Sequence, residues 1–202
     1  KAQTTRHRIM GIINSDDEQI VFSDTPGVLK PNYKLQESML AFSEGALQDA
    51  DILLYVTDVV EKPDKNADFI TKVQRMKIPI FVLINKIDLS NQEGVMKLIE
   101  AWHEVLPTAE IFPISAQAKL NVDAVLARIK ELLPDSPPYF DKDQWTDKPA
   151  RFFVNEIIRE KILLYYDKEI PYSVEVAVEE FKESENNIRI RAIIYVERDS
   201  QK

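Results

Sequence analysis

Two short polar motifs stand where apolar runs of strand length end, and both carry residues that can bind a nucleotide. The first is Asp24-Thr25-Pro26-Gly27 and the second is Asn85-Lys86-Ile87-Asp88. In the first, a carboxylate at a strand end can hold Mg²⁺ through water, and a glycine N–H can meet a terminal phosphate. This motif therefore predicts Asp24 as a metal residue and Gly27 as a phosphate donor. A Pro-Gly turn that only ends the strand is the alternative.

The second motif has the groups that distinguish guanine from adenine. The Asp88 carboxylate can accept hydrogen bonds from the N1–H and the 2-amino group of guanine. The Asn85 amide can meet the other edge of the base, and the stem of Lys86 can lie over its ring. The alternative is a helix N-terminus with Asp88 or Ser90 as its cap.

A third motif, Ser115-Ala116-Gln117, follows a later apolar run. A small residue such as Ala116 lets a backbone N–H approach the guanine carbonyl oxygen, and Ser115 can stiffen the loop. Taken alone, the motif is an ordinary short polar loop. It gains meaning from the two motifs before it.

The elements that would position these motifs alternate along the first two thirds of the chain. Continuous apolar runs suit strands that are buried in a parallel sheet, and amphipathic helical patterns separate them. The runs cover residues 19–23, 52–57, 80–84 and 111–114. We therefore expect a doubly wound α/β domain that opens with a hairpin over 8–23. In such a fold, ligands bind beyond the carboxyl ends of the strands, where the motifs fall.

A stretch rich in proline and aspartate separates two regions of different pattern. We predict a linker or an extended crossing segment over 135–149, between a first domain of residues 1–134 and a second region of residues 150–202. The second region shows an amphipathic helix over 151–166 and then two alternating strands. A helix and two strands are too few for a self-standing domain. We expect half of an α+β domain here.

The composition of the 202 residues excludes several classes of protein. No apolar run approaches ~18 residues, which excludes a transmembrane helix, and no leader pattern predicts export. The absence of cysteine excludes disulfides and thiolate metal sites. A net charge of −8 argues against a broadly basic nucleic-acid-coating protein.

Glycine is unusually scarce. The chain has 4 glycines, whereas average usage of ~7% would give about 14. Because a phosphate-binding loop needs glycine to approach its ligand, and neither GxGxxG nor GxxxxGK[ST] occurs, we expect such a loop to be absent from these residues.

Taken together, the motifs resemble those of the translation-factor-type GTPases. The opening residues KAQTTRHR resemble the first switch segment of the Era GTPases, and residues 150–202 are similar to the first half of their KH-type RNA-binding domain. The resemblance covers nearly the whole chain. It implies a P-loop-NTPase-like GTPase domain over 1–134 without its first strand and phosphate loop, then the linker, then the N-terminal half of a KH domain.

The resemblance also implies a role for each motif residue. Thr5 would reach Mg²⁺ and the γ-phosphate, with Thr4 as its rival. Asp24 would bind Mg²⁺ through water, and Gly27 would donate to the γ-phosphate. The remaining residues would bind guanine: Asn85, Lys86 and Asp88, supported by Ser115 and Ala116.

For the whole protein, the resemblance implies hydrolysis of GTP to GDP with Mg²⁺. The nucleotide would control binding to small-subunit rRNA during assembly of the small ribosomal subunit. The implied location is the cytoplasm, with peripheral inner-membrane association in the family, although no basic amphipathic helix signals a membrane. Val28 stands where Ras-like enzymes have a water-orienting Gln, so water must be positioned otherwise. The alternative is a non-enzymatic RNA- or ribosome-binding module on an α/β scaffold.

RNA binding has weak support in the second region. Residues 150–202 hold nine Lys and Arg against eleven Asp and Glu, which is no electrostatic footprint for RNA. Arg189 and Arg191 share one strand face and are the candidates for RNA contact, but an exposed edge-strand face is the favoured interpretation. The GxxG clamp of KH domains also has no counterpart here. We expect this chain alone to bind nucleotide and RNA weakly or not at all.

Overall fold

The computed structural model describes residues 5–28, 34–61, 66–166 and 174–198. Its packing divides the chain into two compact units. The first comprises Lys1–Gly27 with Pro138–Lys202 and contains two antiparallel hairpins, so we call it the hairpin unit. The second comprises Val28–Pro137 and contains a parallel sheet, so we call it the sheet unit.

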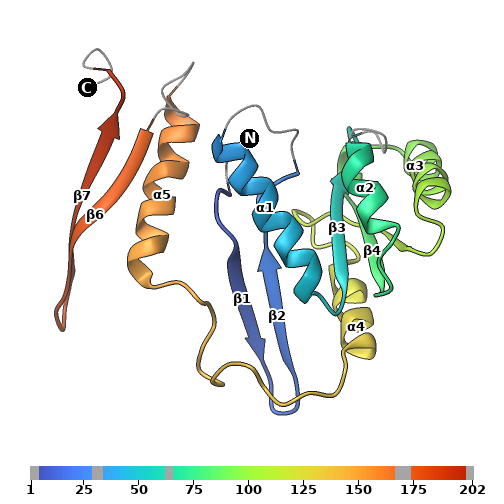
Figure 1. Ribbon diagram of the computed structural model, residues 1–202, viewed down its shortest axis with the longest axis horizontal. Helices are drawn as coiled ribbons and strands as arrows, with labels where there is room; N and C mark the ends of the chain where they lie inside the picture. The colour runs from blue at the N-terminus through green and yellow to red at the C-terminus, as the bar shows by residue number, and fades with distance from the viewer. Residues whose placement is uncertain (1–4, 29–33, 62–65, 167–173, 199–202) are drawn as a thin grey trace. The chain divides into compact units, whose positions relative to one another are not determined.

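The sheet unit is an α/β structure, as the alternating pattern predicted. Its strands pair in parallel in the order β3-β4-β5, and β3 and β4 run side by side in Figure 1. The strands are β3 (Leu53–Asp58), β4 (Ile80–Asn85) and β5 (Glu110–Pro113). The helices are α1 (Lys34–Asp49), α2 (Ala67–Val73), α3 (Gln92–Val105) and α4 (Val122–Leu132).

The central strand, β4, explains why the sheet needs a continuous apolar run. Residues 80–84 are all buried, because helices and neighbouring strands remove both faces from water. Trp102 of α3 is only 1% exposed and packs in the same core, with its ring 5.2 Å from that of Tyr55. The register pairs Asp58 with Asn85, so β3 and β4 end at the same level.

The chain that leaves β4 does not begin a helix in the way the capping alternative supposed. A short 3₁₀ turn, η2 (Ile87–Leu89), comes first and has no side-chain cap. The following helix α3 is capped by Asn91, whose Oδ1 accepts a hydrogen bond from Gly94 N at 2.8 Å. The prediction of Asp88 or Ser90 as the helix cap is therefore wrong, and Asp88 is left for another role.

The hairpin unit begins with the predicted antiparallel hairpin, β1 (Ile9–Asn14) and β2 (Gln19–Asp24). The segment predicted as a linker is bonded to it. Ile12 N donates to Trp145 O at 2.9 Å, and Met10 N donates to the Asp147 carboxylate at 2.8 Å. The Gln19 side chain accepts hydrogen bonds from the backbone N–H groups of residues 139 and 140 at 2.8 and 3.0 Å. This segment is an extended crossing segment with fixed contacts.

The rest of the hairpin unit is α5 (Ala150–Tyr165), β6 (Val174–Glu183) and β7 (Ile188–Val196). Its small core contains Ile162, Val174 and Val176, so α5 packs on one face of the β6–β7 hairpin. The buried side of α5 differs from a simple stripe of its apolar residues, since Ile157 is 55% exposed while Arg159 is 4% exposed. Arg159 can be buried because it forms an ion pair with Glu156 one turn earlier.

The predicted domain boundaries come from the composition of the sequence, whereas the two units are defined by packing in the structure. Packing groups the first hairpin with the later residues, and the boundaries at 134 and 150 remain a prediction. No helix within the described ranges is long and apolar enough to cross a membrane.

Candidate functional site

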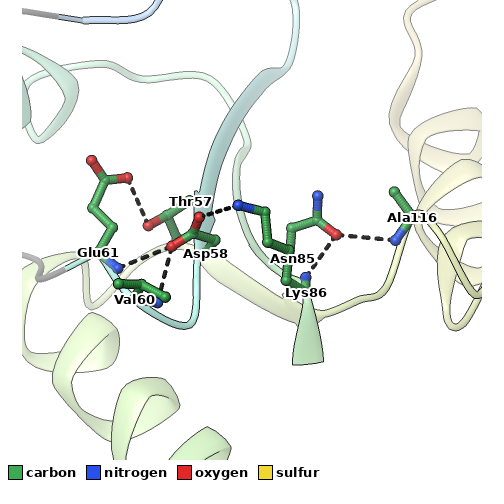
Figure 2. A network of polar contacts seen from close by, with 7 residues as sticks. All are labelled: Thr57, Asp58, Val60, Glu61, Asn85, Lys86 and Ala116. Atoms are coloured by element: carbon green, nitrogen blue, oxygen red, sulfur yellow. Dashed lines mark hydrogen bonds and ion pairs between the residues drawn. The ribbon is translucent and has the colours of Figure 1, made fainter. Parts of the chain in front are cut away.

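At the ends of β4 and β5, the Asn85 amide joins two loops. Its Oδ1 accepts hydrogen bonds from Lys86 N at 2.8 Å and from Ala116 N at 3.0 Å (Figure 2). These bonds connect the second and third sequence motifs, which are 31 residues apart in the chain. The Asn85 Nδ2 points away from both contacts in Figure 2. The oxygen of this side chain therefore organises the site, and the nitrogen is left for a ligand.

Ser115 fixes the carboxylate of Asp88. The Ser115 hydroxyl donates to Asp88 Oδ1 at 2.5 Å and accepts a hydrogen bond from Ala118 N at 3.1 Å. Ser115 is completely buried, whereas Asp88 is exposed. The buried hydroxyl thus sets the direction of an exposed carboxylate, which is the group expected to meet guanine.

Hydrogen bonds fix both the backbone and the ammonium group of Lys86. Its φ of 63° lies in the left-handed region, which is unusual for a residue other than glycine. The ammonium group donates to Asp58 Oδ2 at 2.6 Å, while Asp58 Oδ1 accepts from Val60 N and Glu61 N at 2.9 and 3.0 Å (Figure 2). The hydrogen bond from Lys86 is the main reason that the pKa of Asp58 lies below its ordinary value.

Sequence reasoning missed Asp58. The signal was present, because Asp58 ends β3 in register with Asn85 at the end of β4. The predicted strand stopped at residue 57, one position before this carboxylate.

The predicted metal and phosphate residues lie in the hairpin unit. Thr5 donates a side-chain hydrogen bond to Asp24, at the end of β2. Neighbouring protein atoms partly desolvate this carboxyl group and raise its pKa above the ordinary value, against the lowering effect of hydrogen bonds from Thr5 and the Thr25 backbone. Gly27 is exposed, and a Cβ added there would meet nothing within 4 Å. Thr4 lies outside the described residues.

The structure therefore groups the predicted site residues in two sets. The sheet unit brings together the guanine set: Asn85, Lys86, Asp88, Ser115 and Ala116. The hairpin unit brings Thr5 to Asp24 and also contains Gly27. Val28 packs against the core of the sheet unit.

Of the two RNA candidates, Arg191 has a protein partner. Its guanidinium lies 3.0 Å from the Glu179 carboxylate across the β6–β7 hairpin. Arg189 is exposed on the same strand, in register with Lys182.

The donor set of the hairpin unit fits Mg²⁺. Hydroxyl and carboxylate oxygens are the ligands this ion prefers, and Mg²⁺ typically takes one or two from the protein and the rest from water and phosphate. The described part of the chain holds no group of three or more His, Asp or Glu side chains able to bind a metal by themselves. Thr5 and Asp24 supply one hydroxyl and one carboxylate of the kinds that this ion accepts.

Sheet topology and the polar residues at its strand ends define a protein of the GTPase class. A family model described as a 50S ribosome-binding GTPase matches residues 1–86. Solved structures that share the fold at lower identity include elongation factor SelB of Methanococcus maripaludis with the GTP analogue GPPNHP. That match has 20% identity and a TM-score of 0.55, and it covers 71% of this chain and 31% of the other.

Two solved structures of Era are much more similar. Era in complex with MgGDPNP and nucleotides 1506–1542 of 16S ribosomal RNA is 34% identical, with a TM-score of 0.88 over 98% of this chain and 68% of the other. A variant of Aquifex aeolicus Era bound to GDP·AlF4⁻ has the same identity and TM-score, over 98% and 69%. The chain belongs to the Era family of GTPases.

Proposed function

We propose that the protein containing this chain binds guanine nucleotides and hydrolyses GTP to GDP and phosphate. The observation that carries the proposal is the guanine set at the ends of β4 and β5, where Ser115 fixes Asp88 and Asn85 fixes the loop of Ala116. These contacts hold the side chains that would bind the base in fixed orientations.

The base-binding step follows from the donors and acceptors of these residues. The fixed Asp88 carboxylate accepts hydrogen bonds from the N1–H and the 2-amino group of guanine, which adenine lacks in that pattern. The Nδ2 of Asn85 donates to the opposite edge of the base, and the backbone at Ala116 approaches the carbonyl oxygen. The stem of Lys86 covers one face of the ring.

Thr5, Asp24 and Gly27 are the residues of this chain that would contact Mg²⁺ and the phosphates. The hydroxyl of Thr5 and the carboxylate of Asp24 supply oxygens for the ion, Asp24 through water, and Gly27 donates its N–H to the γ-phosphate. Gly27 is exposed, so its N–H can be reached by a ligand. When bound, Mg²⁺ would neutralise charge that develops on the phosphates.

The attacking water needs a hydrogen-bond donor or acceptor other than the side chain of residue 28. The Val28 side chain has no polar group and packs against the core of the sheet unit. Ras-like enzymes orient the water with a Gln at the corresponding place. Hydrolysis here depends on backbone groups or on another side chain.

We further propose the cytoplasm as the location and small-subunit rRNA as the partner, because an Era relative was solved with a 16S rRNA fragment. In this proposal, residues 1–134 form the GTPase domain, 135–149 the linker and 150–202 the first half of a KH domain. The small core between α5 and the β6–β7 hairpin supports a half-domain. Arg189 and Arg191 are the proposed RNA contacts.

An Asp88→Asn variant of the whole protein tests guanine binding. Asparagine offers an amide that suits the C2 carbonyl of xanthine. The preference for GDP over xanthosine diphosphate should therefore fall by about 5- to 150-fold, since discrimination by such polar contacts is worth about 1–3 kcal/mol. The measurement is competition against a fluorescent GDP analogue.

The matched control is Asp51→Asn, an exposed aspartate that precedes β3. It should leave the preference unchanged. If Asp88→Asn behaves in the same way as the control, the α/β domain is a scaffold and the non-enzymatic alternative is favoured.

A further inference from the structure

We propose that Asp58 is a positioning residue of the nucleotide site, which holds the Lys86 side chain in place to cover the guanine ring. The inference rests on the proposed function of Lys86. It adds a residue from β3, outside the three motifs that the sequence singled out.

The first support is the way in which Asp58 is itself held. Val60 N and Glu61 N both donate to its Oδ1, so the turn after β3 fixes the orientation of the carboxylate. Its Oδ2 is then directed to the Lys86 ammonium group at 2.6 Å (Figure 2). The backbone after β3 thus fixes the Asp58 carboxylate, which in turn binds the Lys86 side chain at the end of β4.

The second support is that Lys86 is held at both ends of its stem. Its backbone N–H donates to Asn85 Oδ1 at 2.8 Å, and its ammonium group is bound by Asp58. A lysine stem has four rotatable bonds and loses much conformational entropy when a ligand orders it. Because Asp58 orders the stem before a ligand arrives, binding of the base costs less.

The third support is the charge and exposure of the pair. Asp58 is ionised, because Lys86 lowers its pKa, so the ammonium group is already neutralised by a carboxylate. The Lys86 side chain is nevertheless 53% exposed. The exposed methylene stem can therefore act as an apolar cover for a ring.

The Asp58→Asn variant of the whole protein is the direct test. Asparagine keeps an oxygen for Val60 N and Glu61 N but loses the charge that binds the ammonium group. We expect affinities for GDP and for inosine diphosphate to fall together by about fivefold, since a partly exposed ion pair has a modest worth and the stem touches the face of the base. The preference for GDP over xanthosine diphosphate should stay unchanged.

A double-mutant cycle separates positioning from a general structural effect. In a Lys86→Met background, the stem remains but the ammonium group is gone, so Asp58→Asn should have no further effect on GDP affinity. Glu61→Gln is the matched control, since the Glu61 carboxylate accepts a hydrogen bond from Thr57 in the same turn. Thermal unfolding of each variant identifies any loss of fold.

The outcomes also separate this inference from the proposed function. If Asp88→Asn changes the preference between guanine and xanthine while Asp58→Asn leaves affinity intact, the role of Asp58 is overturned and the site stands. Equal loss of affinity in the presence and absence of the Lys86 ammonium group overturns it as well. If Asp88→Asn has no effect on the preference, the guanine site itself is wrong.

Discussion

The carboxylates of Asp58 and Asp24 both stand at the ends of strands, but their surroundings act on them in opposite directions. Asp58, in the sheet unit, forms an ion pair with Lys86 and accepts two backbone hydrogen bonds. These contacts lower its pKa. Asp24, in the hairpin unit, is partly desolvated and accepts hydrogen bonds from Thr5 and Thr25, and its pKa is raised. The protein stabilises the ionised form of Asp58, whereas partial desolvation disfavours the ionised form of Asp24.

This difference teaches how the two parts of the proposed site are prepared. The base-binding groups are fixed by contacts within the sheet unit, so they need little rearrangement. The hydrogen bonds to the Asp24 carboxylate come from the Thr5 side chain and the Thr25 backbone, which are both neutral. A cation would therefore stabilise the ionised form of Asp24. In the proposed site, protein contacts fix the groups for the base, whereas the charge of Asp24 would be compensated by a cation.

The largest expected effect comes from removing a hydrogen bond that fixes the base-binding residues of the sheet unit. Ser115→Ala removes a completely buried hydroxyl that bonds both Asp88 and Ala118 N. The free energy of unfolding should fall by about 1–3 kcal/mol, because a buried polar group loses its partner. Urea unfolding measures this loss. The control Ser90→Ala, at an exposed position, should stay within about 0.5 kcal/mol, and an equal loss in both variants would show that Ser115 is not special.

A smaller effect is expected from the ion pair. Asp58→Asn should lower the free energy of unfolding by up to about 1 kcal/mol at neutral pH, because both partners are partly exposed. The folded pKa lies below the ordinary value of 3.8, so this stability is present above pH 3.8 and is lost as the pH falls through the folded pKa. Unfolding curves between pH 7 and 3 should show the difference from wild type persisting down to about pH 3.8. A deficit that disappears well above that pH would contradict the assignment.

The smallest effect has the opposite sign. Asp24→Asn should raise the free energy of unfolding by no more than about 0.5 kcal/mol at neutral pH, since the amide keeps an acceptor and removes a desolvated charge. The folded pKa lies above 3.8, so the gain should diminish as the pH falls through that folded value and be gone near pH 3.8. The same unfolding series measures it. Destabilisation at neutral pH would show that Asp24 resembles Asp58 after all.

The sequence predicted the elements well where its apolar pattern was simple. Residues 80–84 gave β4 because an uninterrupted apolar run fits a strand buried on both faces. The pattern also predicted α5, but the burial of Arg159 depends on an ion pair with Glu156 that periodicity does not reveal. The alternative that placed a helix cap at Asp88 or Ser90 was wrong, because a 3₁₀ turn comes first and Asn91 caps a helix that begins at Gln92.

For the site, residue types were predictable and their partners were not. The guanine set was named from its motifs, and the structure does bring Asn85, Asp88, Ser115 and Ala116 together. Their bonds cross about 30 residues of chain, so spacing alone could not show that Asn85 Oδ1 is engaged by the protein. Asp58 was missed for the same reason, since its role depends on strand register.

The extended segment that follows α4 protects an edge of the molecule. Its residues around Trp145 and Thr146 pair with the outer side of β1, through Ile12 and Gly11. An exposed strand edge is a template for pairing with other chains and a common start of aggregation. Because this segment carries prolines at 137, 138 and 149, which lack an N–H, it is itself a poor template for a further strand. The stretch that marks a boundary in the sequence thus also covers the edge of β1 that faces away from β2.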